Sequence, residues 1–191
     1  MSSAGLAAGA MACAASVFIA TSLDGFIAKK DGSVDWLNDF QASLEEGGED
    51  GGFAEFMASV DALAMGRKTF ETVRDMPDAP WPYGDTPVWV LSNGKVDVPE
   101  RLASKVHLTK GTPEEILKAL AAAGVKDVYV DGGETIRGFV AAGAVKRVIL
   151  TKIPLTLGEG IPLFTEEQKS KLKEVSSKTL RGGMVQTTYT I

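Results

Sequence analysis

Apolar runs and amphipathic segments alternate along the first three quarters of the chain. Runs rich in β-forming residues predict strands at 17–21, 62–65, 87–91, 105–109, 127–130 and 145–153. Helical spacing predicts helices at 53–59, 67–73, 113–124 and 133–142. Because strands and helices alternate in this way, the pattern predicts a parallel sheet with helices packed on its faces.

Local signals mark a helix start and a closing hairpin. Thr112-Pro113-Glu114-Glu115 combines a cap, a proline at the first helical position and two acids in the first turn. Two alternating runs, 171–180 and 184–191, are separated by Arg181-Gly182-Gly183, which is typical of a hairpin. We therefore expect one α/β domain with a mostly parallel sheet and an antiparallel hairpin at its C-terminal end.

The amino terminus has the composition of a tail. Residues 1–23 carry no charged side chain, and Ala, Gly and Ser dominate as far as Ser16. Since the positively charged region of a signal peptide is missing, we interpret 1–14 as a disordered or processed tail and 15–191 as the domain. Organelle targeting by 1–14 stays open. The cytoplasm is the expected location, because one cysteine gives no sign of an oxidising compartment.

Composition excludes several classes of function. The chain has one cysteine, Cys13, and one histidine, His107, so we expect no metal site and no intramolecular disulfide. His107 lies in an alternating strand-like run and is interpreted as structural. The formal charge of −5 argues against a nucleic-acid binder. We expect no membrane partner, a small-molecule substrate and a bound cofactor, with a homodimer as one option.

One strand end is suited to a phosphate-bearing ligand. Residues 128–136 (V-Y-V-D-G-G-E-T-I) predict a strand that stops at Gly132 and Gly133 and continues as a helix. Adjacent glycines let a ligand approach the backbone, and the amino end of a helix attracts a phosphate. The Rossmann and P-loop fingerprints are both absent from the sequence.

Two further strand ends have a similar design. Residues 65–71 (M-G-R-K-T-F-E) place two cations and a hydroxyl at a second strand-to-helix junction, and 90–94 (V-L-S-N-G) end a third strand with small polar groups. Because the carboxyl ends of parallel strands meet at one crevice, these junctions indicate an extended cofactor with several phosphates.

Five motifs occur in an order that resembles a known family. They are A-T-S-L-D-G-F-I-A at 20–28, D-W-L at 35–37, G-R-K-T-F-E at 66–71, D-G-G at 131–133 and I-P-L-T-L-G-E-G-I-P-L-F at 153–164. Over residues 16–191 the chain resembles the dihydrofolate-reductase-like superfamily, in the branch of the reductase domain of the riboflavin-biosynthesis deaminase-reductase. The resemblance implies a three-layer fold and an NADPH-dependent reductase.

The resemblance also implies which residues form the site. The cofactor would be bound by Ala20, Ile27, Trp36, Gly66, Arg67, Lys68, Thr69, Leu91, Ser92, Gly132, Gly133, Glu134, Thr135 and Ile136. The substrate side would carry Asp131, Phe56 and Met57. Asp24 matches a position that braces a loop.

The family position of a substrate-binding acid is altered. In dihydrofolate reductases an acid follows the tryptophan by about five residues, whereas this chain has Gln41 at that spacing. Asp39 and Asp50 are therefore the catalytic candidates, with Glu49 and Glu55 as further options. The riboflavin-pathway reductase has a phosphate-binding arginine on the next helix, where this chain has only apolar residues at 56–58.

Three functions remain open from the sequence. We favour hydride transfer from NADPH to a pterin-like or other small heterocyclic substrate. One alternative is the riboflavin-pathway reduction of 5-amino-6-(5-phosphoribosylamino)uracil, and the other is a non-catalytic cofactor-binding or assembly module. Residues 31–61 hold nine acids and no Lys or Arg, which predicts that this region disfavours a phosphorylated substrate.

Overall fold

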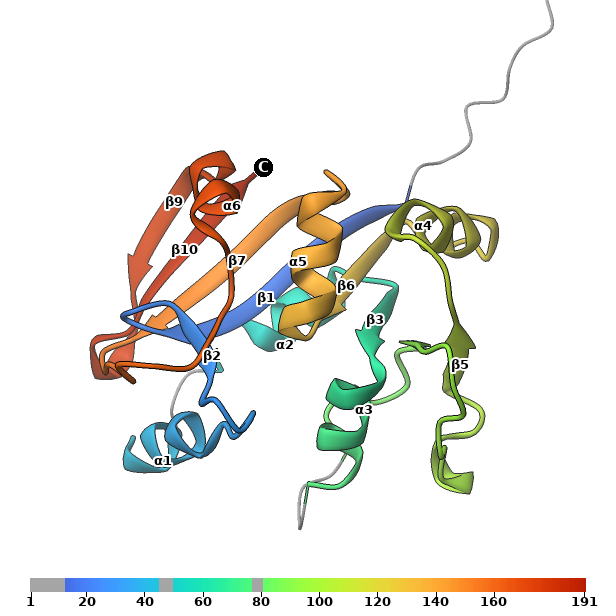
Figure 1. The fold of residues 1–191 in the computed structure, drawn as a ribbon, viewed down its shortest axis with the longest axis horizontal. Helices are drawn as coiled ribbons and strands as arrows, with labels where there is room; N and C mark the ends of the chain where they lie inside the picture. Colours follow the sequence, from blue (N-terminus) through green and yellow to red (C-terminus); the bar gives the residue numbers. More distant parts are fainter. Residues whose placement is uncertain (1–12, 45–49, 77–80) are drawn as a thin grey trace, which may run out of the picture.

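The computed structural model describes residues 13–44, 50–76 and 81–191. An eight-stranded sheet in the order β5-β4-β3-β6-β1-β7-β10-β9 forms its centre (Figure 1). Its strands are β1 (Ala14–Ser22), β3 (Ala62–Gly66), β4 (Val88–Leu91), β5 (Val106–Thr109), β6 (Asp127–Asp131), β7 (Val145–Ile153), β9 (Lys173–Thr179) and β10 (Val185–Thr190). A separate two-stranded sheet pairs β2 (Phe26–Ala28) with β8 (Ile161–Pro162).

Six α-helices accompany the sheet within the described ranges. They are α1 (Asp35–Ser43), α2 (Phe53–Ala58), α3 (Arg67–Arg74), α4 (Pro113–Ala122), α5 (Gly133–Ala141) and α6 (Glu166–Lys171). Short 3-10 turns lie at Glu100–Leu102 and Arg181–Gly183. The capping box expected at the start of α4 is present, since the Thr112 hydroxyl accepts from the Glu115 N–H and the Glu115 carboxylate accepts from the Thr112 N–H.

The predicted α/β fold is confirmed. Strands β5, β4, β3, β6, β1 and β7 run parallel, whereas β10 is antiparallel to both β7 and β9. Every strand expected in the first three quarters of the chain is found, although β1 begins at Ala14, three residues before the expected start. The first hairpin strand begins at Lys173 because a capped helix, α6, occupies 166–171. Most of the tail expected at 1–14 lies outside the described residues.

Helices cover both faces of the sheet, as expected. On one face α4 and α5 pack through Ile116, Leu120, Ile136, Phe139 and Val140 against alternate residues of β1, β3 and β6. On the other face Phe56 of α2 and Phe70 of α3 pack against the intervening residues of β3, β4 and β6. The sheet is therefore the middle of three layers.

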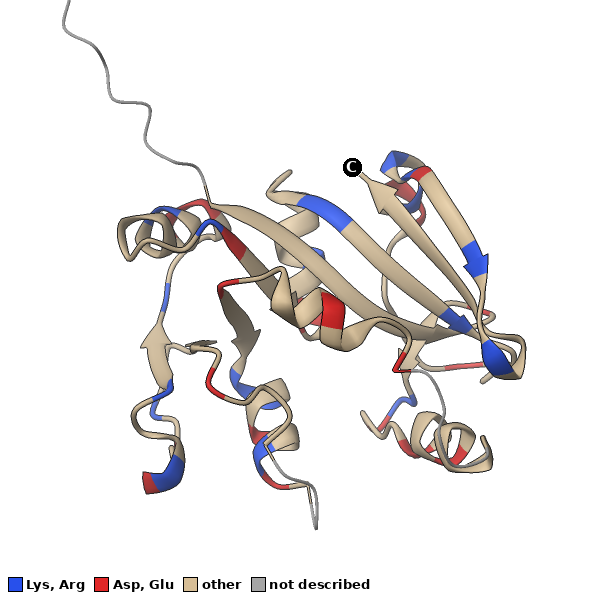
Figure 2. Cartoon of the chain, turned by 180° about the vertical axis from the view of Figure 1, so that it is seen from behind, with Lys and Arg blue, Asp and Glu red and all other residues tan. Residues whose placement is uncertain are grey.

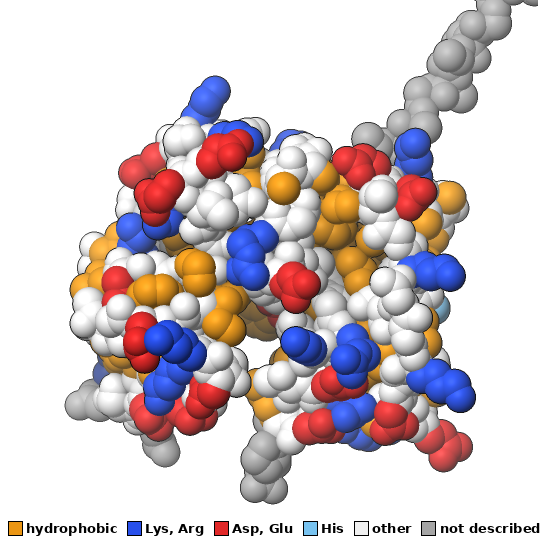
Figure 3. Space-filling model, in the orientation of Figure 1, with side chains coloured by type: hydrophobic (Ala, Val, Ile, Leu, Met, Phe, Trp, Pro, Cys, Tyr) orange, Lys and Arg blue, Asp and Glu red, His pale blue; other side chains and the backbone are white. Residues whose placement is uncertain are grey.

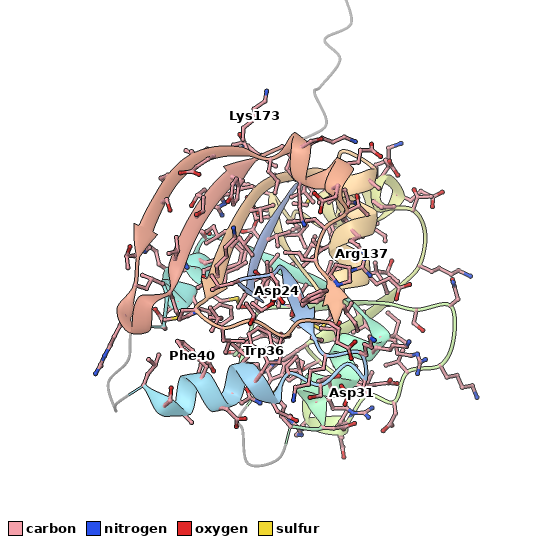
Figure 4. All side chains as sticks on the ribbon, turned by 60° about the vertical axis from the view of Figure 1, so that its left-hand side comes forward. Asp24, Asp31, Trp36, Phe40, Arg137 and Lys173 are labelled. Atoms are coloured by element: carbon pink, nitrogen blue, oxygen red, sulfur yellow. The ribbon has the colours of Figure 1, made fainter. Side chains whose placement is uncertain are left out.

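A third cluster lies where α1 meets the hairpin end of the sheet. Trp36 on α1 packs with Ile153, Leu180 and Met184, and all four are nearly fully buried. Figure 4 shows Trp36 and Phe40 on the side of α1 that faces the sheet. The apolar positions within 139–153 that are buried are therefore core residues, among them Phe139, Val148 and Ile153.

Two absences hold for the described residues alone. No helix among them is long and apolar enough to span a membrane. No three His, Cys, Asp or Glu side chains among them are grouped so that they could hold a metal ion. His107 is exposed on the edge strand β5 and rests against the ring of Trp89, with centroids 5.1 Å apart.

Candidate active site

The predicted strand-to-helix junctions lie side by side at the carboxyl ends of the parallel strands. Strand β3 pairs with β6 on one side and with β4 on the other, with Met65 opposite Asp131 and Gly66 opposite Leu91. The carboxyl ends of these strands therefore meet, as the sequence predicted. Figure 3 shows the molecule hollowed between the part that carries α1 and the part that carries α3.

Three glycines bring these junctions into close contact. Gly132 has φ of 90°, and a Cβ added to it would overlap the Thr69 hydroxyl. A Cβ on Gly133 would overlap the terminal methyl of Ile27, and one on Gly66 would lie 3.1 Å from the Thr135 hydroxyl. We call Gly66, Thr69, Gly132, Gly133 and Thr135 the glycine cradle. Glycine is required at these positions because Thr69, Ile27 and Thr135 pack closely against the backbone, which stays partly exposed where the two helices begin.

Both helices of the cradle present backbone amide groups at their amino ends. Helices α3 and α5 begin after Gly66 and Gly132 without a side-chain cap. The first intrahelical bond of α5 runs from the Ile136 N–H to the Gly132 carbonyl, so the preceding N–H groups have no partner within the helix. Two positive helix ends at adjacent strand ends suit the phosphates of a dinucleotide, and the residues present therefore fit NADPH.

Cationic side chains surround the cradle. Arg67 donates to the Glu71 carboxylate one turn along α3, at 3.0 Å, whereas Lys68 is exposed and has no ion pair among the described residues. Arg137 lies on α5, donates to the Pro162 carbonyl at 2.7 Å and would be 3.3 Å from a Cβ on Gly133. Sequence reasoning missed Arg137, although its position one turn after Gly133 is a usable signal.

The other predicted cofactor residues lie in different surroundings. Glu134 is exposed in the first turn of α5, whereas Ile136 is fully buried in the core. Leu91 ends β4, and the hydroxyl of Ser92 accepts from the Gly94 N–H at 3.1 Å, which closes a tight turn. Their direct contact with a cofactor stays a prediction.

Ala20 and Trp36 belong to the cluster around α1. Ala20 packs partly buried against this cluster, in which Trp36 is 6% exposed. The indole N–H of Trp36 is buried and has no hydrogen-bond partner among the described residues. Their placement beside a nicotinamide ring stays a prediction, with which an unpaired donor is compatible.

Asp131 is the acid beside the cradle. Its Oδ1 accepts from the Gly132 N–H at 2.8 Å, and its Oδ2 accepts from the Tyr83 hydroxyl at 3.3 Å. Tyr129 lies close enough to Asp131 for the Asp131 carboxylate to contribute to the raised pKa of Tyr129. The Tyr129 hydroxyl donates to the Phe18 carbonyl at 2.9 Å. Removal from water raises the pKa of Asp131, and the hydrogen bonds from Gly132 and Tyr83 only partly offset this increase.

A groove lies between α2 and the segment 81–86. It is an open depression of about 410 Å³, lined by Phe53, Ala54, Met57, Ala58, Pro82, Tyr83, Gly84, Asp85 and Thr86. Of the residues predicted to contact substrate, Met57 lines this groove, whereas Phe56 is buried beneath it at 3% exposure. Asp131 connects to it through Tyr83. Tyr83 thus links the groove to the cradle.

The predicted catalytic acids Asp39 and Asp50 lie on or near α1 and α2. The Asp50 carboxylate accepts from the N–H groups of Gly52 and Ala54 at 2.8 and 2.7 Å, which caps α2 and lowers the pKa of Asp50. Asp39 is exposed on α1, and Glu49 lies outside the described residues. Catalysis by Asp39 or Asp50 stays a prediction.

Asp24 has the bracing contacts expected of it. Its carboxylate accepts from the Ser22 hydroxyl and from the N–H groups of Leu157 and Gly158, at 3.2 and 2.7 Å for the two amides. The hydrogen bond from Ser22 is the main cause of the lowered pKa of Asp24. Asp24 therefore fixes the loop after β7 against the end of β1, and it lies in the middle of the view in Figure 4.

Comparisons with known proteins agree with this architecture. The family described as the RibD C-terminal domain matches residues 15–186. The protein YwjB of Bacillus subtilis (strain 168), described as uncharacterized, is 34% identical over 160 residues, which cover 82% of this chain and 87% of YwjB. The riboflavin biosynthesis protein RibD of Mycobacterium tuberculosis is 30% identical over 152 residues, 73% of this chain and 41% of that protein.

Solved structures share the fold. A protein from Shewanella sp. PV-4, provisionally called a riboflavin biosynthesis protein, is 41% identical and matches with a TM-score of 0.82 over 93% of this chain and 98% of its own. Dihydrofolate reductase from Enterococcus faecalis, in a complex with NADP(H), matches with a TM-score of 0.59 at 21% identity over 93% of this chain and 95% of its own. That second likeness shows the fold alone.

Proposed function

Because the chain belongs to the RibD C-terminal domain family, we propose that it is an NADPH-dependent reductase that delivers hydride to a pterin-like or other small heterocyclic substrate. The observation that carries the proposal is the glycine cradle, in which two uncapped helix ends meet at the carboxyl edge of the sheet. The cradle fits a pyrophosphate, and the cations of α3 lie at its border.

Each part of the cradle would have a separate task. Gly66 and Gly132 let the pyrophosphate approach the backbone, while the amides at the start of α3 and α5 donate to it. Ile27, which already lies against Gly133, would restrict the position of the nicotinamide end. When bound, NADPH supplies the hydride, and the protein contributes orientation and a proton.

Asp131 is the residue we propose as the source of that proton. Reduction of a C=N or C=C bond needs one proton for each hydride delivered. Asp131 immediately precedes the cradle, and its raised pKa favours the protonated acid. Tyr83 and the Gly132 amide hold its two oxygens, so the carboxyl group has a fixed orientation.

A cofactor titration followed by a substrate screen tests this function. Purified protein is titrated with NADPH and with NADH by nicotinamide fluorescence, and NADPH oxidation is then followed with a panel of pterins and diaminopyrimidines. We expect saturable NADPH binding and turnover of at least one heterocycle. Failure to bind either nucleotide would contradict the proposal.

Two alternatives remain as outcomes of the same assays. Riboflavin-pathway activity is favoured by the family and by the relative RibD, and it predicts efficient turnover of 5-amino-6-(5-phosphoribosylamino)uracil. A non-catalytic binding module predicts NADPH binding without oxidation by any compound, including this phosphorylated one.

A further inference from the structure

We propose that the groove between α2 and 81–86 is the substrate subsite and that it accepts a flat heterocycle without a phosphate group. This inference rests on the proposed reductase function and names the substrate class for it. It goes against the substrate expected from the riboflavin pathway, because that substrate carries a ribose phosphate.

The walls of the groove suit a planar ring. Phe53 and Met57 come from α2, and Pro82 and Tyr83 come from the opposite segment. The Tyr83 ring is held edge-on against Trp81, with centroids 5.1 Å apart and an interplanar angle of 87°. Phe53 is likewise packed edge-on against Tyr129 and Phe18, at 6.4 and 5.5 Å. Aromatic walls fixed in this way favour stacking with an aromatic or heteroaromatic ligand.

One wall of the groove leads directly to the proposed reaction centre. The Tyr83 hydroxyl is 3.3 Å from the Asp131 carboxylate, and that carboxylate accepts from Gly132, which belongs to the cradle. A ring that stacks in the groove would lie against Tyr83, whose hydroxyl leads to the Asp131 carboxylate. Ring N–H groups are the natural partners of a carboxyl oxygen at this place.

Among the described residues that line the groove there is no Lys or Arg, and Asp85 is the charged one. The cation Lys105 pairs with Asp85 at 2.7 Å and donates to the Gly84 carbonyl at 2.8 Å. Helix α2 adds the exposed Glu55. Figure 2 shows acidic colour and no basic colour on this helix.

Arg147, on β7, contacts α2 and is not among the described residues that line the groove. Arg147 donates to the Ser59 hydroxyl at 3.2 Å, and its guanidinium lies over the Phe56 ring at 5.5 Å. A phosphate in the groove would therefore meet the Asp85 carboxylate, with no Lys or Arg among the described lining residues to balance its negative charge. Repulsion of this kind is an effective way to reject a ligand that otherwise fits.

A matched pair of ligands tests the proposal. Binding of 5-amino-6-(5-phosphoribosylamino)uracil and of its dephosphorylated nucleoside is measured by calorimetry, without oxygen and with NADP⁺ bound. The compound 6-hydroxymethylpterin and its phosphate form a second pair. We expect the phosphate-free member of at least one pair to bind about 10-fold tighter or more. Equal or tighter binding of the phosphorylated member in both pairs overturns the proposal.

Two substitutions locate the effect. Met57→Arg places a cation in the groove, and Asp85→Lys does so at an almost fully exposed side chain, so at least this second protein should fold. Each substitution is expected to raise the affinity for the phosphorylated ligand about 10-fold relative to the affinity for its phosphate-free partner. Val175→Arg, on the exposed strand β9, adds the same charge elsewhere and should leave the ratio unchanged.

The cofactor titration distinguishes a wrong substrate class from a wrong reductase assignment. If NADPH binds but no ligand of either pair does, the substrate class is wrong and the reductase assignment stands. The same conclusion follows if both groove substitutions leave the ratio of the two affinities within a pair unchanged. If NADPH does not bind, the reductase assignment itself is wrong.

Discussion

The cradle and the groove lie next to each other, yet they are built differently. The cradle consists of backbone, with glycines where side chains would collide and helix ends that attract anions. The groove consists of side chains, with aromatic walls and an acidic border. Their charges differ as well, because residues 31–61 hold nine acids and no base, while the rest of the chain has sixteen acids and twenty Lys and Arg. A polyanionic cofactor and a phosphate-free substrate would each find a matching side.

Asp131→Asn should have the largest effect, because it should impair the reaction without impairing cofactor binding. Loss of the proton donor is expected to lower kcat by about 10²–10⁴-fold for the heterocycle that the wild type reduces. NADPH affinity should stay within about twofold, because the amide oxygen can still accept from Gly132. Steady-state kinetics and a fluorescence titration measure both quantities. A parallel loss of cofactor affinity would contradict the division between the sides.

The same substitution predicts a change in the pH dependence of stability. Because folding raises the pKa of Asp131, the native state keeps the proton to a higher pH than the unfolded chain does. The contribution of this group to stability therefore falls as pH rises from about 4, the unfolded value, through the higher native pKa. Urea unfolding at several pH values should show this decrease in the wild type and its absence in Asp131→Asn.

Gly132→Val should break the cradle. Its side chain would overlap Thr69 and would occupy a backbone conformation with φ of 90°. We expect NADPH affinity to fall by about 100-fold, roughly 2.7 kcal/mol, together with a loss of stability. Gly138→Ala is the matched control on the same helix, since an added Cβ there has nothing within 4 Å. It should leave binding unchanged and add about 0.5–1 kcal/mol of stability.

Lys68→Gln tests the charge of the cradle side. Lys68 is exposed at the amino end of α3 and unpaired among the described residues, so its ammonium is free for a phosphate. Its loss should weaken NADPH about 10-fold, roughly 1.4 kcal/mol, and reduce the dependence of affinity on salt. Lys173→Gln on β9 is the control with the same loss of charge. Equal effects of both substitutions would indicate a general field instead of a local contact.

Tyr83→Phe gives the smallest effect, at the border between the sides. The lost hydrogen bond stabilises the ionised form of Asp131, so its removal should raise the pKa of that carboxyl further. A titration of the Asp131 carboxyl carbon by NMR measures this, and a shift downward would contradict the contact. The free energy of unfolding should fall by about 1 kcal/mol, with NADPH affinity unchanged.

The sequence predicted the cradle better than the groove for a physical reason. Gly66, Gly132 and Gly133 are required by local backbone geometry, which leaves a visible motif at each strand end. The contact of Tyr83 with Asp131 joins residues 48 positions apart, and that of Gln186 with the Gly51 carbonyl joins residues 135 apart. Such contacts depend on the finished fold and leave no spacing to read.

Short elements and capping roles were also hidden in the sequence. Strands β2 and β8 have three and two residues, too few for an alternating pattern. Asp50 is predicted to be catalytic from its place near the second helix, and the structure adds that its carboxylate caps α2. The hydrogen-bond partners that define such a cap cannot be identified from the local sequence alone.

Hydrogen exchange with and without NADPH tests the central claim most directly. Peptides that cover 66–70 and 131–136 report on the amides at the start of α3 and α5 separately from the groove segments 53–58 and 81–86. We predict that NADPH slows exchange in the first two peptides and that Gly132→Val abolishes this protection. Protection confined to the groove segments, or unchanged exchange throughout at saturating NADPH, would contradict the assignment of the glycine cradle as the cofactor site.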